Sequence, residues 1–97
     1  MDGPDEIIHQ STRLKIVATL NALHSGDALE FGKLKQILGA TDGNMATHLG
    51  ALEKVGYIAV QKDFVGKKPR TRVSLTRAGR KAFDRHVAYL RDLLEGG

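Results

Sequence analysis

The chain has 97 residues, enough for one domain with a modest core, and its 41% hydrophobic and 27% charged residues are typical of a folded globular protein. Its formal net charge is +4, and the lack of cysteine excludes disulfides, thiolate metal sites and cysteine redox switches. No apolar run approaches the roughly 18 residues of a membrane-spanning helix, and the acidic residues 1–6 do not resemble a signal peptide.

The first part of the chain predicts a leader, a helix and a short strand. We expect residues 1–5 to form a flexible leader, because Gly3 and Pro4 disfavour regular structure. Residues 6–97 then form a single domain. A helix is predicted over residues 6–24, where apolar residues recur mostly at three- and four-residue steps. Gly26 ends this helix, and residues 28–30 are expected to pair as a very short strand.

Two more helices follow in quick succession. Residues 31–38 have apolar side chains at helical spacing and are closed by Gly39. Thr41 is a favourable N-cap for a third helix over about residues 42–55, and Gly56 provides its C-terminal stop. Two short helices joined by so tight a glycine-containing turn predict a helix-turn-helix.

A positively charged hairpin comes next. Residues 57–64 and 70–75 alternate as strands, and residues 66–69 are expected to form the tip between them. In the second strand Thr71 and Val73 share one face, and Arg70 and Arg72 share the other. Eight lysines and arginines lie in residues 61–81 against a single acid, so this stretch carries +7 and the remainder of the chain −3.

The last predicted helix covers about residues 76–95 and is capped by Thr76. Its apolar stripe consists of Ala82, Phe83, Val87, Leu90, Leu93 and Leu94. The outer half of this stripe would face water unless it packs against the first helix or against a second subunit.

The exposed side of the third helix carries short polar residues that suit the major groove of DNA, which admits one α-helix. An asparagine such as Asn44 can form two hydrogen bonds with adenine, and Gly43 allows close approach. The candidate DNA contacts of this helix are Thr41, Gly43, Asn44, Thr47, His48 and Lys54. An ordinary solvent-exposed helix face is the alternative interpretation.

The cations of the hairpin repel one another on a two-stranded ribbon, and a phosphate backbone would relieve this repulsion through counterion release. Arginine at such a tip can also enter a narrow minor groove. The candidate contacts here are Lys62, Lys67, Lys68, Arg70 and Arg72. The alternative is a charged edge that blocks aggregation between strands.

Three segments together resemble the small winged-helix transcriptional regulators of bacteria and archaea, in the MarR/ArsR-like group and in its compact form with only the DNA-binding domain. They are the H-L-x-x-L-E-x-x-G-Y-I pattern of residues 48–58, the basic hairpin 66–71 and the L-T-x-x-G-R pattern of residues 75–80. The likeness extends over residues 6–95. It implies an α+β, mainly α fold: a winged helix-turn-helix with a three-helix core, a two-stranded wing and a long C-terminal helix.

The resemblance also implies a division of roles. The helix at about 42–55 would be the recognition helix in the major groove, and the wing, residues 62–72, would lie on the backbone or in the minor groove. A homodimer, formed through the C-terminal helix at about 76–95, would read a pseudo-palindromic site on double-stranded DNA. The expected dimer interface comprises Ile7, Ile8, Phe83, Val87, Leu90, Leu93 and Leu94.

Other functional classes find little support in the sequence. A glycine-rich phosphate loop, a nucleophile elbow and paired carboxylates are all missing, so we predict no catalytic residue and no enzyme. Asp84, His86 and His9 lack a second histidine pair, so we predict no metal and no cofactor. A winged helix that binds another protein, or a non-specific nucleic-acid-binding protein, stays an alternative. We expect a cytoplasmic, nucleoid-associated protein without a membrane partner, and the sequence identifies no effector.

Overall fold

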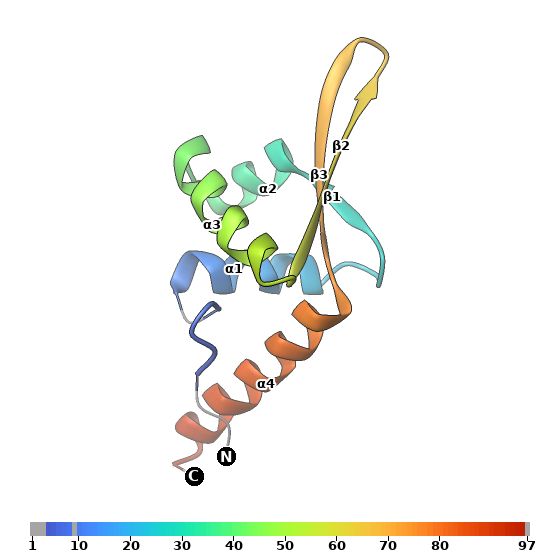
Figure 1. Cartoon of the computed structure of the whole chain (residues 1–97). Helices are drawn as coiled ribbons and strands as arrows, with labels where there is room; N and C mark the ends of the chain where they lie inside the picture. Colours follow the sequence, from blue (N-terminus) through green and yellow to red (C-terminus); the bar gives the residue numbers. More distant parts are fainter. Residues whose placement is uncertain (1–3, 9, 97) are drawn as a thin grey trace.

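The computed structural model describes residues 4–8 and 10–96 as a helical body with two projections (Figure 1). A two-stranded ribbon extends from one end and the last helix from the other, and the principal extents are 53 × 25 × 21 Å. The elements are α1 (Ser11–Asn21), β1 (Ala28–Glu30), α2 (Phe31–Leu38), α3 (Asp42–Lys54), β2 (Ile58–Val65), β3 (Lys68–Leu75) and α4 (Arg77–Leu94). This order confirms the predicted helix-turn-helix, hairpin and long C-terminal helix.

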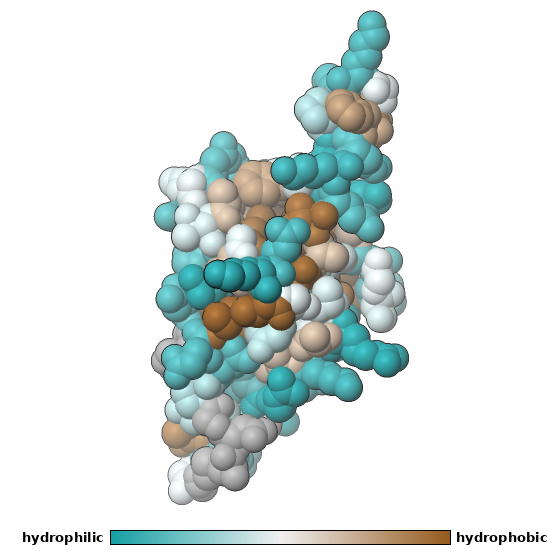
Figure 2. All heavy atoms as spheres, viewed as in Figure 1, coloured by the Kyte–Doolittle hydropathy of each residue, from teal (hydrophilic) through white to brown (hydrophobic). Residues whose placement is uncertain are grey.

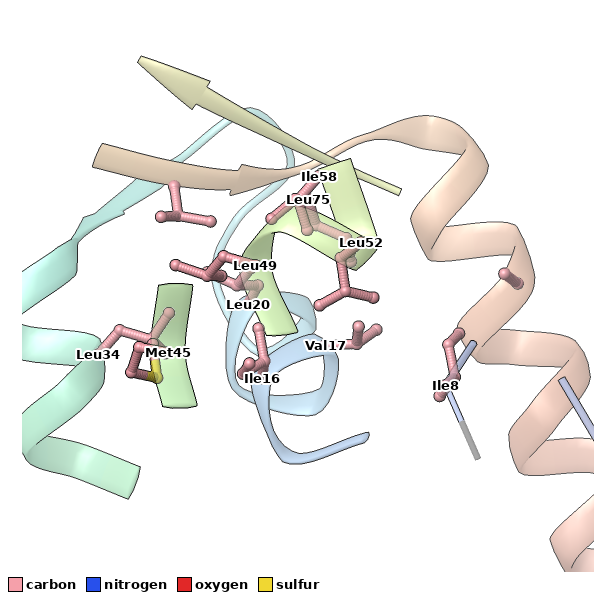
Figure 3. Close-up of a cluster of buried hydrophobic side chains, with 12 residues drawn as sticks. Ile8, Ile16, Val17, Leu20, Leu34, Met45, Leu49, Leu52, Ile58 and Leu75 are labelled. Carbon is pink, nitrogen blue, oxygen red and sulfur yellow. The ribbon is translucent and has the colours of Figure 1, made fainter. Parts of the chain in front are cut away.

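The core lies where α1, α2 and α3 meet the base of the ribbon (Figure 3). Each helix contributes side chains at helical spacing, and the strands contribute alternate residues, as periodicity requires. The fully or nearly fully buried side chains of these elements are Ile16, Val17, Leu20, Leu34, Met45, Leu49, Leu52, Ile58, Val73 and Leu75. This packing fixes α3 against α1 and α2, with its opposite side in solvent.

The strands form one antiparallel sheet in the order β1-β3-β2. The register of β2 and β3 runs from Ile58 opposite Leu75 to Val65 opposite Lys68, so only Gly66 and Lys67 form the turn. Gly66 has a φ of 63°, which glycine adopts without strain. The predicted tip of residues 66–69 was therefore too long. Pro69 belongs to β3 beyond the reach of β1, where β3 has a free edge that tolerates proline.

The first helix begins at Ser11, five residues later than predicted, because Asp5 organises a turn before it. The Asp5 Oδ1 atom accepts hydrogen bonds from the backbone N–H groups of Ile7 (2.9 Å) and Ile8 (3.0 Å). Such side-chain bonds compete with helix formation. The predicted flexible leader lies largely on residues 1–3, outside the described residues, but its last residue, Asp5, has defined hydrogen-bond partners.

Asp5 also connects three distant parts of the chain. Its Oδ2 atom accepts a hydrogen bond of 2.8 Å from the hydroxyl of Tyr57, just after α3, and its backbone N–H donates to Nδ1 of His86 in α4 at 3.3 Å. His86 is only 1% exposed. No pattern in the sequence indicates that this histidine is buried inside its own chain.

We expect the Asp5 contact to be visible in the titration of Tyr57. Burial raises the pKa of Tyr57 most strongly, and the hydrogen bond to Asp5 and the charge of Asp5 raise it further, against a smaller lowering by Arg85. Substituting Asp5→Ala should therefore lower the pKa of Tyr57 without removing the effect of burial. Absorbance titration of tyrosinate in a Tyr89→Phe background isolates Tyr57, and an unchanged midpoint would contradict the contact.

The direction of the pKa shift of Tyr57 determines the pH range in which this residue contributes to stability. Because the pKa of Tyr57 is raised on folding, its contribution to stability is complete below the unfolded value, about 10, and is lost as pH rises through the higher folded value. Through its effect on Tyr57, Asp5→Ala should thus alter the pH dependence of unfolding in strong alkali.

The start of α4 is joined closely to the end of α3. The Thr76 hydroxyl accepts a hydrogen bond from the N–H of Gly79 (3.0 Å) and donates one to the carbonyl of Gly56 (2.6 Å). The Thr76 N–H donates to the carbonyl of Tyr57 at 3.0 Å. A Cβ atom on Gly79 would overlap that same carbonyl oxygen and would lie 2.7 Å from Cδ1 of Leu75. The L-T-x-x-G pattern therefore encodes an N-cap and a close contact between helix and backbone.

Candidate nucleic-acid interface

The second helix of the helix-turn-helix begins with the N-cap that the sequence predicted. Gly39 ends α2 in the left-handed conformation, and the Thr41 Oγ1 atom accepts a hydrogen bond of 3.2 Å from the N–H of Asn44. The hydrogen of the Thr41 hydroxyl is left to donate to an acceptor such as a phosphate. Asp42 in the first turn pairs with Lys35 of α2 at 2.6 Å. This acid already occupies the positive end of the helix dipole, where a phosphate would otherwise be favoured.

The middle of the exposed face of α3 is formed by Gly43, Thr47 and Lys54, which lie on the same side of the helix and in solvent. The hydroxyl of Thr47 donates to the carbonyl of Gly43 at 3.0 Å, so its lone pairs are the groups left for a partner. A Cβ on Gly43 would meet nothing within 4 Å. The backbone of α3 is therefore open to close approach at its leading end.

One flank of α3 faces α1. His48 is half-buried, and its Nδ1 atom accepts a hydrogen bond of 3.1 Å from Nε of Arg13 in α1. Asn44 lies one turn before His48 on this flank and is exposed. Arg13 was not predicted as a site residue, because no local pattern connects positions 35 residues apart. The Arg13 guanidinium therefore places a cation beside the exposed face of α3.

The other flank of α3 lines a hollow of about 550 Å³ between the helix and the ribbon. In Figure 2 hydrophobic surface is visible in this region. The lining residues are Phe31, Ala46, Leu49, Gly50, Glu53, Val60, Lys62 and Thr71. Ala46 and Gly50 were not predicted as site residues; the available signal was their small size on the exposed side of an otherwise polar helix.

The ribbon has two different faces, because cross-strand partners point to the same side and successive residues to opposite sides. The inner face, toward α3, carries the pairs Val60–Val73, Lys62–Thr71 and Phe64–Pro69; the hollow identifies it, since Val60, Lys62 and Thr71 line it. The outer face carries the pairs Gln61–Arg72, Asp63–Arg70 and Val65–Lys68. Arg70 and Arg72 therefore lie on the side of the ribbon away from α3.

On the outer face, Asp63 pairs with both arginines. It accepts two hydrogen bonds from Arg70 (2.9 and 2.8 Å) and one from Arg72 (3.2 Å). The hydrogen bond from Arg70 holds the pKa of Asp63 below its ordinary value, against a partial burial that raises it, and the charges of both arginines lower it further. The pairs thus persist at neutral pH and are lost only in acid, as pH falls through the lowered pKa. The sequence predicts repulsion between the cations of the hairpin, and the pairing with Asp63 reduces it for Arg70 and Arg72.

The remaining candidates of the ribbon are Lys62 on the inner face, Lys67 in the turn and Lys68 at the start of β3. All three side chains are exposed. In the part of the chain that the structure describes, none of them forms an ion pair. No carboxylate of the described residues therefore offsets their charge, which leaves it for a partner outside the chain to neutralise.

The predicted dimer residues separate into two groups. Ile8 is 0% exposed and belongs to the core of its own chain, so in this structure it is not accessible to a second subunit as expected. Ile7 packs partly against the same core. The α4 residues remain accessible: Leu94 is 88% exposed, Leu93 is exposed, and Phe83, Val87 and Leu90 are half-buried. The predicted interface is therefore reduced to α4, with Ile7 at its margin.

The described residues offer neither a metal centre nor a membrane-spanning helix. Within residues 4–8 and 10–96 no group of three histidine, cysteine, aspartate or glutamate side chains could hold a metal ion; His9 of the imagined site lies outside these residues. None of the helices described is both long and apolar enough to cross a lipid bilayer.

Comparisons with known proteins agree with this geometry. A family model described as a winged helix DNA-binding domain matches residues 12–94. An uncharacterized protein of Methanocaldococcus jannaschii is 34% identical over 82 residues, which cover 84% of this chain and 86% of that protein.

Solved structures show the same architecture. A transcriptional regulator homologue from Pyrococcus horikoshii OT3 matches with a TM-score of 0.84 and 26% identity, covering 95% of this chain and 88% of that one. A MarR-family transcriptional regulator from Porphyromonas gingivalis W83 matches with a TM-score of 0.70 over 98% of each chain, and at 21% identity this likeness shows the fold alone. The resemblance and the fold class drawn from the sequence are both confirmed.

Proposed function

Because this chain belongs to the family of winged helix DNA-binding domains, we propose that it is a homodimeric regulator that binds specific sites on double-stranded DNA. We assign it to the MarR-like transcriptional regulators and not to the enzymes, because the family model describes a DNA-binding domain and transcriptional regulators share its fold. The ribbon β2–β3 is its wing. The finer assignments below, to grooves, partners and residues, are part of this proposal.

One observation carries the proposal: the open side of α3 and the inner face of the wing border a single hollow, which Lys62 lines. Lys67 and Lys68 lie farther out on the same ribbon, and none of the three lysines forms an ion pair in the described residues. With α3 in the major groove, one sugar–phosphate backbone would pass through the hollow and the wing would reach the adjacent minor groove. Ala46 and Gly50 would leave room for the backbone. The donors closest to that path are Lys62 and Thr71.

The roles of the individual residues follow from their surroundings. We assign base contacts to Asn44 and Thr47, close approach to Gly43, and phosphate contacts to Thr41, Lys54 and the wing lysines. His48 would act mainly by holding Arg13 beside the sugar–phosphate backbone of the DNA. Arg70 and Arg72 would contribute less than their charge suggests, because both are paired with Asp63, whose single negative charge offsets part of theirs.

The proposal includes a homodimer formed through α4. Phe83, Val87, Leu90 and Leu94 follow one another at four- and three-residue steps, so they form one apolar line along the helix. Leu94, at the C-terminal end of this line, is the most exposed apolar side chain of α4. A second copy of the same line would cover it with matching chemistry. We place the protein in the cytoplasm on the nucleoid, which follows from a DNA partner.

The dimer is tested by sedimentation equilibrium. Wild-type protein should sediment at twice the 10.6 kDa of one chain, and Leu90→Glu with Leu94→Glu should sediment at one chain mass while keeping its fold. Lys81→Glu is a matched control, since it places the same side chain on an exposed part of α4. A wild-type protein that is monomeric at micromolar concentration would remove the dimer from the proposal.

DNA binding itself is tested by titrating salt against binding to a random duplex. Each phosphate contact should contribute a slope of about −0.9 in log K against log salt. A winged helix that binds only another protein would show no duplex binding at low salt, and that result would reject the proposed function.

A further inference from the structure

The tip of the wing exposes apolar side chains that nothing in the described part of the chain covers. Phe64 is 71% exposed and Val65 is 56% exposed, and Pro69, opposite Phe64, is exposed as well. Figure 2 shows hydrophobic surface near the end of an otherwise hydrophilic ribbon. Keeping a phenylalanine ring in water forgoes stabilisation that burial would provide. Its position therefore favours a partner outside the chain.

The face on which Phe64 lies indicates where that partner approaches. Phe64 and Pro69 continue the inner face outward by one step beyond Lys62 and Thr71, which line the hollow toward α3. Val65, by contrast, lies on the outer face beside Lys68. The apolar pair thus points to the side from which the recognition helix and the hollow are reached.

The charges around this pair indicate the chemistry of the partner. Lys62 shares its face, Lys67 and Lys68 follow at the turn, and the three carry no ion-pair partner in the described residues. An apolar ring among uncompensated cations complements a surface that is apolar between rows of negative charge. The minor groove of DNA has these properties: sugar walls about 6 Å apart lie between two lines of phosphates.

We propose that Phe64, supported by Pro69, enters the minor groove of duplex DNA next to the major groove occupied by α3. The ring packs against sugar walls and base edges, and the lysines bind the phosphates on either side. Phenylalanine and proline are among the apolar side chains that proteins insert into minor grooves. This inference depends on the proposed DNA-binding function and adds an apolar contact to it.

The first test separates apolar from ionic contributions. Phe64→Ala should weaken binding to an A·T-rich duplex by about tenfold or more and leave the salt slope unchanged, because the ring releases no counterion. Val65→Ala is the matched control: it is the next residue, also exposed but on the outer face, and should change affinity less than about twofold. Both tip substitutions should leave the thermal melt of the free protein unchanged.

The second test locates the ring in the groove. Diaminopurine in place of adenine adds an amino group to the minor groove and leaves the major-groove edge unchanged. Wild-type protein and Val65→Ala should lose affinity for the modified duplex, whereas Phe64→Ala should bind both duplexes equally. The chain has no tryptophan, so Phe64→Trp provides a single reporter whose emission should shift and become protected from a neutral quencher on binding.

The outcomes distinguish the two proposals. If wild-type protein binds duplex with a steep salt dependence but Phe64→Ala behaves like Val65→Ala, the minor-groove contact is rejected and the DNA-binding function stands. In the Phe64→Trp variant, an indole whose emission stays unshifted and accessible to the quencher in a saturated complex rejects the contact as well. If wild-type protein binds no duplex, the proposed function fails and this inference fails with it.

Discussion

Gly79→Ala should destabilise the protein by about 3 kcal/mol or more, at the upper end of the cost of overpacking. The added Cβ would overlap the carbonyl oxygen of Tyr57, which is backbone and cannot rotate away. That carbonyl also accepts the N–H of Thr76, so a shift would disturb the junction between α3 and α4. Each kcal/mol lowers the melting temperature of a domain this size by about 4–8 °C, so we expect a fall of at least about 12 °C.

Gly50→Ala is the matched control for this substitution. It makes the same chemical change in the middle of a helix, but the new Cβ meets nothing within 4 Å. Alanine should therefore stabilise α3 by about 0.5–1 kcal/mol. Thermal melts of the two variants without DNA should move in opposite directions. A Gly79→Ala variant that melts with the wild-type protein would show that α4 does not contact the Tyr57 carbonyl so closely.

Replacing Lys62, Lys67 and Lys68 together by alanine should weaken binding to every duplex by about two orders of magnitude. Release of one counterion contributes about fivefold at physiological salt, and no carboxylate of the described residues pairs with the three lysines. The salt slope should become shallower by up to about 0.9 for each lysine that contacts phosphate. Fluorescence anisotropy with labelled random duplex over a range of salt concentrations measures both quantities.

Arg70→Ala with Arg72→Ala is the comparison that tests the role of Asp63. These two arginines lie on the outer face and are paired, so their loss should reduce the salt slope less than loss of the lysines. If the arginine pair dominated the salt slope, the assignment of phosphate contacts to the lysines would be wrong.

Asn44→Ala should weaken binding to the preferred site by about 1–3 kcal/mol and leave binding to random duplexes unaffected.

Much of this architecture could be predicted from local patterns. Some features depend on residues only a few positions apart, so the sequence predicts them: the apolar spacing of α2 and α3, the cap at Thr41 and the glycines that end the helices. The alternation in β3 likewise predicted that Arg70 and Arg72 would face away from the core. The L-T-x-x-G pattern could be recognised as a family feature, but its reason appears only in three dimensions. Thr76 and Gly79 meet the end of α3, some 20 residues earlier in the chain.

The errors have a common cause in contacts between distant or competing groups. Asp5 binds the N–H groups of the residues that periodicity assigned to the first helix, so that helix starts late. Asp63 pairs with two arginines across the hairpin, and a count of charges does not reveal which cations are paired. His48 was assigned to DNA alone, although Arg13 reaches it from α1. Local patterns determine elements well, but they do not determine which side chains remain free to bind.

Selection of duplexes from a random pool by the wild-type protein tests the central claim most directly. A homodimer with α3 in successive major grooves should enrich two inverted half-sites whose centres lie about 10 base pairs, or a multiple of this, apart. The Asn44→Ala variant should enrich a weaker consensus with the same spacing. Retention of no duplex, or of duplexes without any shared sequence, would contradict a dimeric, sequence-specific regulator.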